Sequence, residues 1–212
     1  RILADSGVTV QHNPPSNLKV GSGLAPIRAL LDAGVNVSLG TDGCGSIEGT
    51  DMQNSLYLAG LLQKLRGDHT TWVGATDAFR FATMGGARAL GRQKDLGAIE
   101  KGRLADITAY NIKSIPFSPY NNPVNQLVYS ASRADVDLVM VEGEVILKGG
   151  KLTKVDEDRL IDEIHKAHAR IEPQLAASER DVERLRETYE RIYRRCQCQM
   201  ISPDTYPARF PV

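Results

Sequence analysis

The chain has 212 residues, 42% of them hydrophobic, and its 26 Lys and Arg balance 26 Asp and Glu. A net charge of zero lacks the basic profile of a general nucleic-acid binder, and no apolar run reaches the roughly 20 residues of a membrane span. Three cysteines are too few and too unevenly placed for a disulfide scaffold. We therefore expect a globular cytoplasmic protein whose partners are neither nucleic acids nor membranes.

The first third of the chain alternates apolar runs with amphipathic segments. A helix end at 1–6 leads into a strand at Val8–Gln11, which stops where two prolines remove backbone donors. A loop rich in Gly, Ser and Asn follows. Periodicity then predicts a second strand and three helices. These are the strand Val35–Leu39 and the helices Ala25–Ala33, Met52–Leu65 and Trp72–Leu90.

Strands that are apolar throughout and separated by helices indicate an α/β fold with a parallel sheet under helices. Two strands are too few for such a sheet. The sequence also begins with Arg1, as if in the middle of an element. We therefore expect the C-terminal part of a longer protein. This segment is either the end of a larger α/β barrel or a partner for strands that lie outside it.

The pattern changes near Gly97, where alternating strands replace the strand–helix order. Ile107–Tyr110 is one such strand, and Val136–Val141 with Val145–Leu147 forms a hairpin with glycine at its turns. Between them, Ile115–Pro123 has the composition of a loop. These features predict a small antiparallel unit.

The tail is helical and heavily charged. A first helix begins at Asp156 with an apolar stripe, and Pro173 is expected to end or kink it. A second helix is predicted at Ser178–Arg195, with apolar residues at intervals of three and four. Cys196–Val212 is rich in proline and is predicted to be an extended arm. The helices could form an arm between copies of the chain, or a solvated pair packed on their own barrel.

Asp42 is the sharpest candidate for chemistry. It follows the strand Val35–Leu39 and lies between Gly40 and Gly43. In α/β barrels the loops at the carboxyl ends of the strands hold the active site. The same residues could also form a simple turn, because Asp and Gly are favoured in turns.

His12 occupies the equivalent place after the earlier strand. Two polar residues at equivalent strand ends are a stronger signal than one. A lone histidine, however, is often a hydrogen-bonding residue of the scaffold rather than a ligand. Both interpretations stay open at this point.

Three other features are weaker candidates. His165 and His168 share a helix face, but no carboxylate or cysteine pair completes a metal shell around them. Cys196 and Cys198 lack the usual two-residue gap of zinc ligands. The loop 21–23 lacks the Lys-Ser/Thr of a phosphate loop. We therefore interpret the histidines as part of a solvated helix face, and we expect neither a zinc site at the cysteines nor a phosphate site at the loop.

Five motifs follow one another along the chain. They are HNPPSNLK at 12–19, GVNVSLGTDG at 34–43, GARALG at 86–91, EKGRLAD at 100–106 and NQLVY at 125–129. This ordered set resembles the amidohydrolase superfamily, in its cytosine deaminase-like and triazine hydrolase-like branch. The branch includes S-adenosylhomocysteine/methylthioadenosine deaminases, guanine deaminases and chlorohydrolases. The resemblance covers about residues 7–155.

The resemblance implies a fold and a site. Residues 1–96 would be the end of a (β/α)8 barrel, residues 97–155 part of a small β-sandwich domain, and residues 156–212 a helical tail with an extended arm. One divalent metal, zinc or iron, would sit in the barrel mouth. Asp42 corresponds to the family's aspartate after strand eight, which binds the metal and acts as general base. His12 corresponds to a position after strand seven that supports the site or lines the substrate pocket.

The implied function is metal-dependent hydrolytic deamination, or dechlorination, of a nitrogen heterocycle such as a purine, pterin or triazine. The family's His-x-His pair, its two further histidines and its glutamate would lie before residue 1. Residues 44–49 also depart from the branch's usual continuation, which leaves the substrate open. The alternative is a catalytically incomplete fragment or a scaffold, because Asp42 alone cannot hold a catalytic metal.

Overall fold

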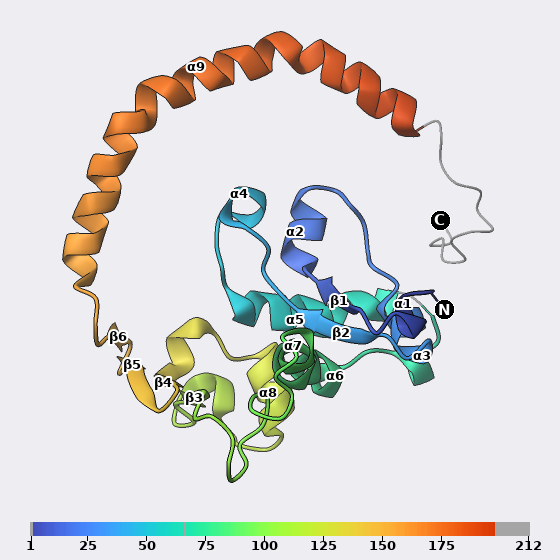
Figure 1. Cartoon of the computed structure of the whole chain (residues 1–212), viewed down its shortest axis with the longest axis vertical. Coiled ribbons are helices and arrows are strands. Elements are labelled where there is room, and N and C mark those ends of the chain that lie inside the picture. Colours follow the sequence, from blue (N-terminus) through green and yellow to red (C-terminus); the bar gives the residue numbers. More distant parts are fainter. Residues whose placement is uncertain (1, 66, 198–212) are drawn as a thin grey trace. The chain divides into compact units, whose positions relative to one another are not determined.

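The computed structural model describes residues 2–65 and 67–197. By its internal contacts the chain divides into two units, Arg1–Thr153 and Lys154–Val212. Figure 1 traces the elements of both units in chain order. Among the described residues, no helix combines the length and the apolar character that crossing a membrane would require.

The first unit begins with short helices around two strands and ends in a small sheet. Its α-helices are α1 (Ile2–Asp5), α2 (Pro14–Lys19), α3 (Ile27–Asp32), α4 (Cys44–Ile47), α5 (Met52–Leu62), α6 (Ala75–Arg80), α7 (Gly86–Ala89) and α8 (Pro123–Tyr129). Its strands are β1 (Thr9–His12), β2 (Asn36–Leu39), β3 (Ile107–Tyr110), β4 (Val136–Val141), β5 (Glu144–Lys148) and β6 (Lys151–Leu152). Single 3₁₀ turns occupy Gln63–Leu65, His69–Thr71, Ile115–Phe117 and Arg133–Asp135.

Strands β1 and β2 pair in parallel, which confirms the predicted parallel arrangement. The register runs from Thr9 opposite Asn36 to His12 opposite Leu39. Every residue of β2 after Asn36 is buried. Parallel strands need a crossover connection, and α2 and α3 lie within it. The carboxyl ends of both strands therefore lie at one edge.

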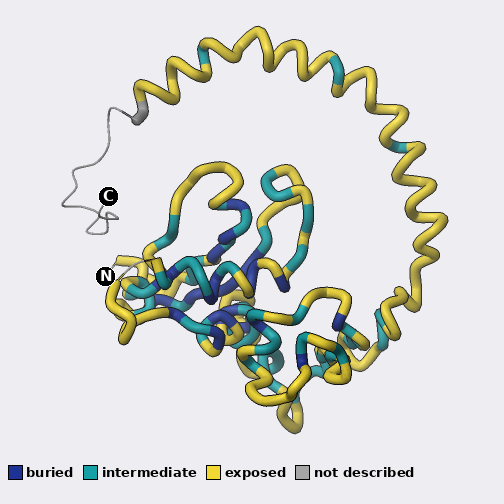
Figure 2. Tube along the Cα trace, turned by 180° about the vertical axis from the view of Figure 1, so that it is seen from behind, coloured by how far each residue is buried: buried dark blue, intermediate teal, exposed yellow. Residues whose placement is uncertain are grey.

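The core of the first unit lies between β2 and the helices α3, α5, α6 and α8. Ile27, Val73 and Val128 are completely buried there, and Val37 reaches them from β2. Figure 2 shows the buried stretches gathered in these elements. Gln53 is a buried polar residue of α5, and it donates to the backbone carbonyl of Leu127 in α8. This bond satisfies an amide that burial would otherwise leave costly.

The predicted helix Trp72–Leu90 is a continuous helical run from Ala75 to Ala89 with an irregular centre. Phe81–Gly85 is a π-helical segment between α6 and α7. Asn36 of β2 donates from its Nδ2 to the Gly85 carbonyl at 3.0 Å and to the Thr9 hydroxyl at 2.8 Å. A strand side chain thus supplies a hydrogen bond at the end of the π segment.

Two prolines predicted only to stop a strand also begin a helix. Pro14 and Pro15 form the first turn of α2, where a missing N–H costs nothing because the first turn has no intrahelical acceptors. The loop expected after His12 is therefore partly helical. In the same way, Pro123 starts α8 after the loop Ile115–Pro123, and Asn122 caps it by accepting from the Asn125 N–H.

Strands β3 to β6 form a four-stranded antiparallel sheet in sequence order. This confirms the predicted antiparallel unit and its hairpin. The β4–β5 turn places Glu142 and Gly143 at positive φ, as a tight turn requires. The wider barrel, sandwich and domain boundaries at 96 and 155 stay predictions.

Helix α9 (Glu157–Gln197) makes up all of the described part of the second unit except residues 154–156. A helix end at Pro173 and a separate helix from Ser178 are wrong, because α9 is continuous through Pro173. The alternative of a kink at Pro173 stays a prediction. Proline removes one backbone hydrogen bond from a helix, but the long helical stretches before and after Pro173 keep the remaining backbone hydrogen bonds. Figure 1 shows α9 as one curved helix. Of the predicted arm, residues 198–212 lie outside the described residues.

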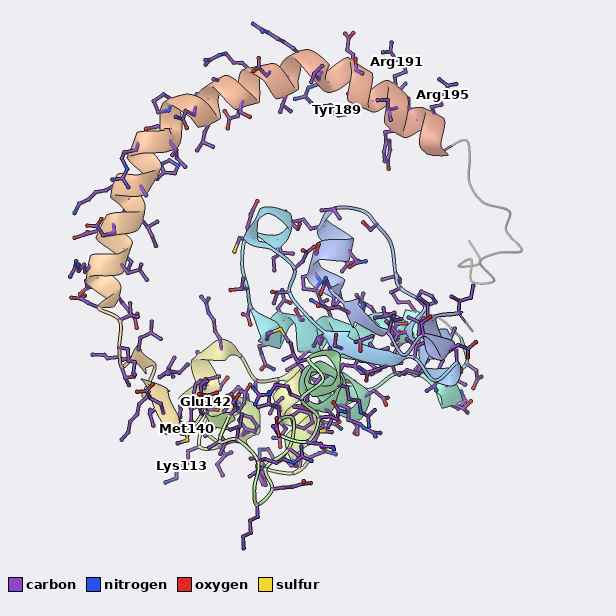
Figure 3. All side chains as sticks on the ribbon, viewed as in Figure 1. Lys113, Met140, Glu142, Tyr189, Arg191 and Arg195 are labelled. Carbon is purple, nitrogen blue, oxygen red and sulfur yellow. The ribbon has the colours of Figure 1, made fainter. Side chains whose placement is uncertain are left out.

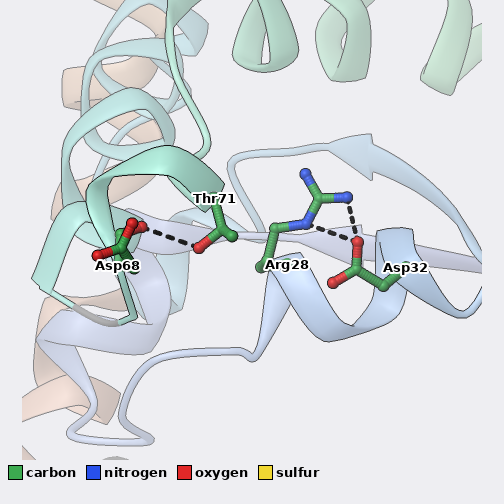
Figure 4. A network of polar contacts seen from close by, with 4 residues as sticks. All are labelled: Arg28, Asp32, Asp68 and Thr71. Atoms are coloured by element: carbon green, nitrogen blue, oxygen red, sulfur yellow. Dashed lines mark hydrogen bonds and ion pairs between the residues drawn. The ribbon is translucent and has the colours of Figure 1, made fainter.

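Local polar contacts stabilise the surface turns. Arg28 donates through Nε to Asp32 one turn later at 2.8 Å, and the Thr71 hydroxyl donates to the Asp68 carbonyl at 2.9 Å (Figure 4). Arg28 and Asp32 are half exposed. A surface pair of this kind contributes at most about 1 kcal/mol.

Candidate active site at the strand ends

The two predicted site residues lie at the same edge of the parallel pair. His12 is the last residue of β1, and Asp42 follows three residues after the end of β2. The Gly40 N–H donates to the His12 carbonyl at 3.0 Å and continues the pairing beyond Leu39. A Cβ at Gly40 would collide with the side chains of Gln11 and Asn13. A larger residue at position 40 would therefore require these two side chains to move where the second strand turns toward Asp42.

The Asp42 carboxylate is exposed and held by two hydrogen bonds. Its Oδ1 accepts from the Gly43 N–H at 2.7 Å, and its Oδ2 accepts from the Ser16 hydroxyl at 2.6 Å. The backbone of Asp42 has a φ of 73°. Aspartate tolerates this left-handed conformation better than most residues. The local contacts therefore fix both the backbone and the carboxylate.

The hydrogen bond from Ser16, followed by that from the Gly43 N–H, lowers the pKa of Asp42 below its ordinary value of 3.8. Donors to the charged form stabilise it, whereas desolvation here acts weakly in the opposite direction. The carboxylate is consequently ionised at neutral pH. It can bind a cation or accept a proton from a nearby acid.

Ser16 is the residue that sequence reasoning missed. It lies on α2 and is only 4% exposed. The prolines before it predict the end of a strand, but Pro at the first helical positions is also a helix-start signal. Reading Pro14 in that way would have placed Ser16 on a helix directly after the strand.

His12 is the last residue of β1, one residue beyond the predicted strand end at Gln11. Its side chain is buried, and neither Nδ1 nor Nε2 has a hydrogen-bond partner among the described residues. Burial lowers the pKa of His12 to about 4. The imidazole is therefore neutral at pH 7, with two unsatisfied ring nitrogens close to the strand ends. No hydrogen bond or ion pair joins it to Asp42 in the described part of the chain.

The short helix α4 flanks Asp42 on the other side. It corresponds to the segment whose sequence departs from the branch, and it packs against α2. Lys19 at the end of α2 pairs with Glu48 after α4 at 2.7 Å, and this pairing lowers the pKa of Glu48. Both side chains are exposed, so the pair orients the two loops more than it stabilises them.

Among the side chains at the strand ends, Asp42 has the chemistry of a metal ligand. An ionised, exposed carboxylate at a strand end is chemically suited to zinc or another divalent cation. Across residues 2–65 and 67–197, however, no three His, Cys, Asp or Glu side chains gather in a way that could hold a metal ion. Catalytic zinc usually has three protein ligands. Asp42 fits a metal site, but the described residues do not complete one.

The weaker sequence candidates add nothing to this edge. His165 and His168 are exposed residues of α9, in the other unit. The loop 21–23 has glycines at positive φ at both ends. Cys198 lies outside the described residues, and so does the end of the predicted arm.

The sequence model of the amidohydrolase family matches residues 1–146. A curated 5′-deoxyadenosine deaminase from Methanothermobacter thermautotrophicus is 45% identical over 168 residues, which cover 79% of this chain and 39% of that protein. A zinc-bound adenosine deaminase structure from Xanthomonas campestris aligns with a TM-score of 0.78 at 36% identity, over 81% of this chain and 39% of that one. A zinc complex of atrazine chlorohydrolase from Arthrobacter aurescens aligns with a TM-score of 0.71 at 34% identity, over 76% and 36%.

These similarities confirm the resemblance drawn from the motifs at the strand ends. The matched proteins include a deaminase of an adenine nucleoside and a triazine chlorohydrolase, and two of the structures hold zinc. The chain spans less than two fifths of the length of the deaminase from Methanothermobacter thermautotrophicus, with 39% covered.

Proposed function

Because this chain belongs to the amidohydrolase family, we propose that it forms the C-terminal part of a metal-dependent aminohydrolase. In this proposal residues 1–96 complete a (β/α)8 barrel, and residues 97–155 belong to a small β-sandwich domain. The substrate is a small nitrogen heterocycle that carries an amino group. The similarity to deaminases of adenine nucleosides favours a 6-aminopurine nucleoside.

One observation carries the proposal. The Asp42 carboxylate is ionised, exposed and fixed by two donors at the carboxyl end of a parallel strand pair. That edge is where α/β barrels build their active sites. We assign Asp42 two roles, as one ligand of a divalent metal and as the base that accepts a proton from the attacking water.

Zinc, when bound, would supply Lewis acidity that lowers the pKa of water toward neutrality. Asp42 would accept one proton from the water as its oxygen bonds to the ring carbon that bears the amino group. The bond from that carbon to nitrogen then breaks, and the nitrogen leaves as ammonia with the transferred proton. The second proton of the water ends on the adjacent ring nitrogen. Water and the amine are thereby converted to a ring carbonyl and ammonia.

In this proposal, neutral His12 lines the wall of the pocket or supports a ligand. Its buried nitrogens have no described partner, and its pKa of about 4 keeps it uncharged at neutral pH. A neutral imidazole can donate one hydrogen bond and accept another. It would therefore suit a polar heterocycle without repelling a nearby cation.

Dechlorination of a triazine is a second candidate reaction. The structural similarity to an atrazine chlorohydrolase favours it. The same base and the same attacking water would serve, but chloride would leave instead of ammonia. Measuring ammonia and chloride release with an aminopurine nucleoside and a chlorotriazine separates the two reactions.

The other alternative is that this chain by itself is not catalytic. The absence of a three-ligand group among residues 2–65 and 67–197 favours it. Elemental analysis and intact mass, measured on one purified sample, decide between the two. About one zinc or iron per chain at a mass well above 23.2 kDa supports the enzyme. No metal at a mass of 23.2 kDa removes the catalytic role from Asp42 in this chain.

Asp42→Asn tests the assignment in the metal-containing protein. Loss of a positioned base lowers turnover by about 10²- to 10⁴-fold, and loss of a ligand also lowers the metal content. Asp32→Asn is the matched control, because Asp32 lies on the surface of α3 and pairs there with Arg28, away from the strand ends. Near-normal ammonia release by Asp42→Asn would overturn the proposed role.

A further inference from the structure

Helix α9 carries a long stripe of exposed apolar side chains. It begins beyond residue 146, where the match to the family ends. Eight large apolar residues of the stripe are between 44% and 59% exposed. They are Ile161, Ile164, Ile171, Leu175, Val182, Leu185, Tyr189 and Ile192. Contiguous exposed apolar surface of this kind usually marks an interaction site.

The stripe follows a heptad repeat without interruption. From Ile161 to Ile192 the spacing alternates strictly between three and four residues, if His168 and Ser178 are included. With Ile161 at position a, the a series is Ile161, His168, Leu175, Val182 and Tyr189. The d series is Ile164, Ile171, Ser178, Leu185 and Ile192. A mean spacing of 3.5 residues keeps one seam facing a partner helix in a left-handed coiled coil.

The residues outside the seam fit the same register. Positions b, c and f are mainly charged or alanine, as the outer face of a coiled coil requires. Pro173 falls at f, the position farthest from the seam. Figure 3 shows Tyr189 of the seam and Arg191 of the outer face on opposite sides of the helix. Pro173 therefore lies on the outer face of α9, where its ring would not contact a partner helix.

We infer that α9 pairs in parallel with α9 of a second copy of this chain, as a two-stranded coiled coil. A partner must carry the same 3.5-residue repeat over the same length, and a second copy does so by identity. In a parallel dimer each g residue lies near the following e residue of the partner. Asp181 then faces Arg186 of the second copy, and the symmetry of the dimer repeats this attraction.

The other flanking pairs contain no repulsion. From the N-terminal end they join Leu160 to His165, Ala167 to Glu172, Gln174 to Glu179 and Thr188 to Tyr193. No pair brings like charges together. The polar residues His168 and Ser178 meet their own counterparts only in the parallel register, and single polar core positions are a known means of fixing register.

Sedimentation of the full 212-residue chain tests the pairing. The expected mass is twice 23.2 kDa. Leu175→Glu places a charge in the seam at position a and should shift the mass to that of the monomer. Ala176→Glu introduces the same residue at the neighbouring position b and should leave the dimer intact. A monomeric unmodified chain, or equal behaviour of the two variants, overturns the proposal.

Cross-linking tests the orientation and does not depend on disrupting the helix. In a chain whose native cysteines are replaced by serine, Ile164→Cys places a thiol at d near the N-terminal end of the seam. A parallel dimer brings these two thiols together, whereas an antiparallel dimer places them at opposite ends. Ala177→Cys, at the outward position c, is the control. Oxidation should give a covalent dimer with Ile164→Cys only. Absence of that cross-link overturns the parallel pairing. Neither readout uses metal or turnover, so the result is independent of the proposed function.

Discussion

The Ser16 hydroxyl donates a hydrogen bond of 2.6 Å to Oδ2 of Asp42, across 26 positions of sequence. It joins the helix that follows β1 to the loop that follows β2. Ser16 is buried, whereas the Asp42 side chain is open to solvent. A rigid donor thus orients an accessible carboxylate, and this is the arrangement that a positioned ligand or base needs.

Ser16→Ala should raise the pKa of Asp42 toward its ordinary value of 3.8, because the hydrogen bond from Ser16 is the largest cause of the lowered pKa. Alanine fits the same space and removes only the donor. The carboxyl carbon chemical shift of Asp42, followed by NMR between pH 2 and about 6, measures the change. Ser22→Ala, on an exposed loop, should leave the titration of Asp42 unchanged. An unchanged midpoint in Ser16→Ala would show that the hydrogen bond is absent in solution.

Periodicity predicted the strands and their pairing because those elements depend on local patterns. The apolar runs that became β1 and β2 are short and β-branched, and the alternation of β3 to β5 is regular. The helices α2 and α8 were missed for one reason, since both begin at proline after a strand or a loop. Proline is a stop signal for a strand and a start signal for a helix, and composition alone does not separate the two.

Asp42 could be placed from the sequence, whereas its hydrogen-bond partner could not. Its position follows from the strand before it, and the parallel pairing then brings it to the edge where His12 ends β1. Ser16 reaches Asp42 only because α2 folds back beside the loop, which is a tertiary effect. Pro173 shows the opposite case, because a strong local helix breaker is overridden by the long helix around it.

The stability of the chain should fall as the pH decreases from about 6.5 to about 4. His12 has a folded-state pKa of about 4, below its ordinary value of 6.5. In this window the unfolded chain binds a proton that the folded chain excludes, so protonation favours unfolding. Below about pH 4 both states are protonated and the contribution becomes constant. The shift of the His12 pKa from 6.5 to about 4 corresponds to a loss of about 3 kcal/mol in the free energy of unfolding, at 1.36 kcal/mol per pKa unit.

Urea unfolding of the chain across this pH range measures the effect. His12→Leu should flatten the dependence, because the variant has no group at this position that titrates in the window. Gln11→Leu is the control, because Gln11 is an exposed, non-titrating residue of the same strand and its replacement should leave the slope as it is. Carboxylates with a lowered pKa, such as Asp42 and Glu48, contribute mainly at the acid end of this range, and they are the same in the variant and in the unmodified chain. A slope that survives in His12→Leu would assign the effect to other groups.

Two adjacent glycines of the α6–α7 helical run should respond in opposite directions to alanine. A Cβ at Gly85 would collide with the backbone carbonyl of Val37 in β2, whereas a Cβ at Gly86 would meet nothing within 4 Å. An alanine Cβ is fixed to the helix backbone, and the atom that it would meet is a backbone carbonyl oxygen of β2. No change of side-chain rotamer can therefore relieve the clash. Gly85→Ala should therefore lower the free energy of unfolding by about 1–3 kcal/mol.

Gly86→Ala should raise the same free energy by about 0.5–1 kcal/mol, because Gly86 has helical angles and alanine reduces the entropy of the unfolded chain. Urea midpoints of the two variants, measured side by side, give the sign of each change. Asn36 of β2 donates to the Gly85 carbonyl, so a backbone shift at Gly85 also strains this bond. Equal midpoints for the two variants would mean that the π segment does not lie against β2 in solution.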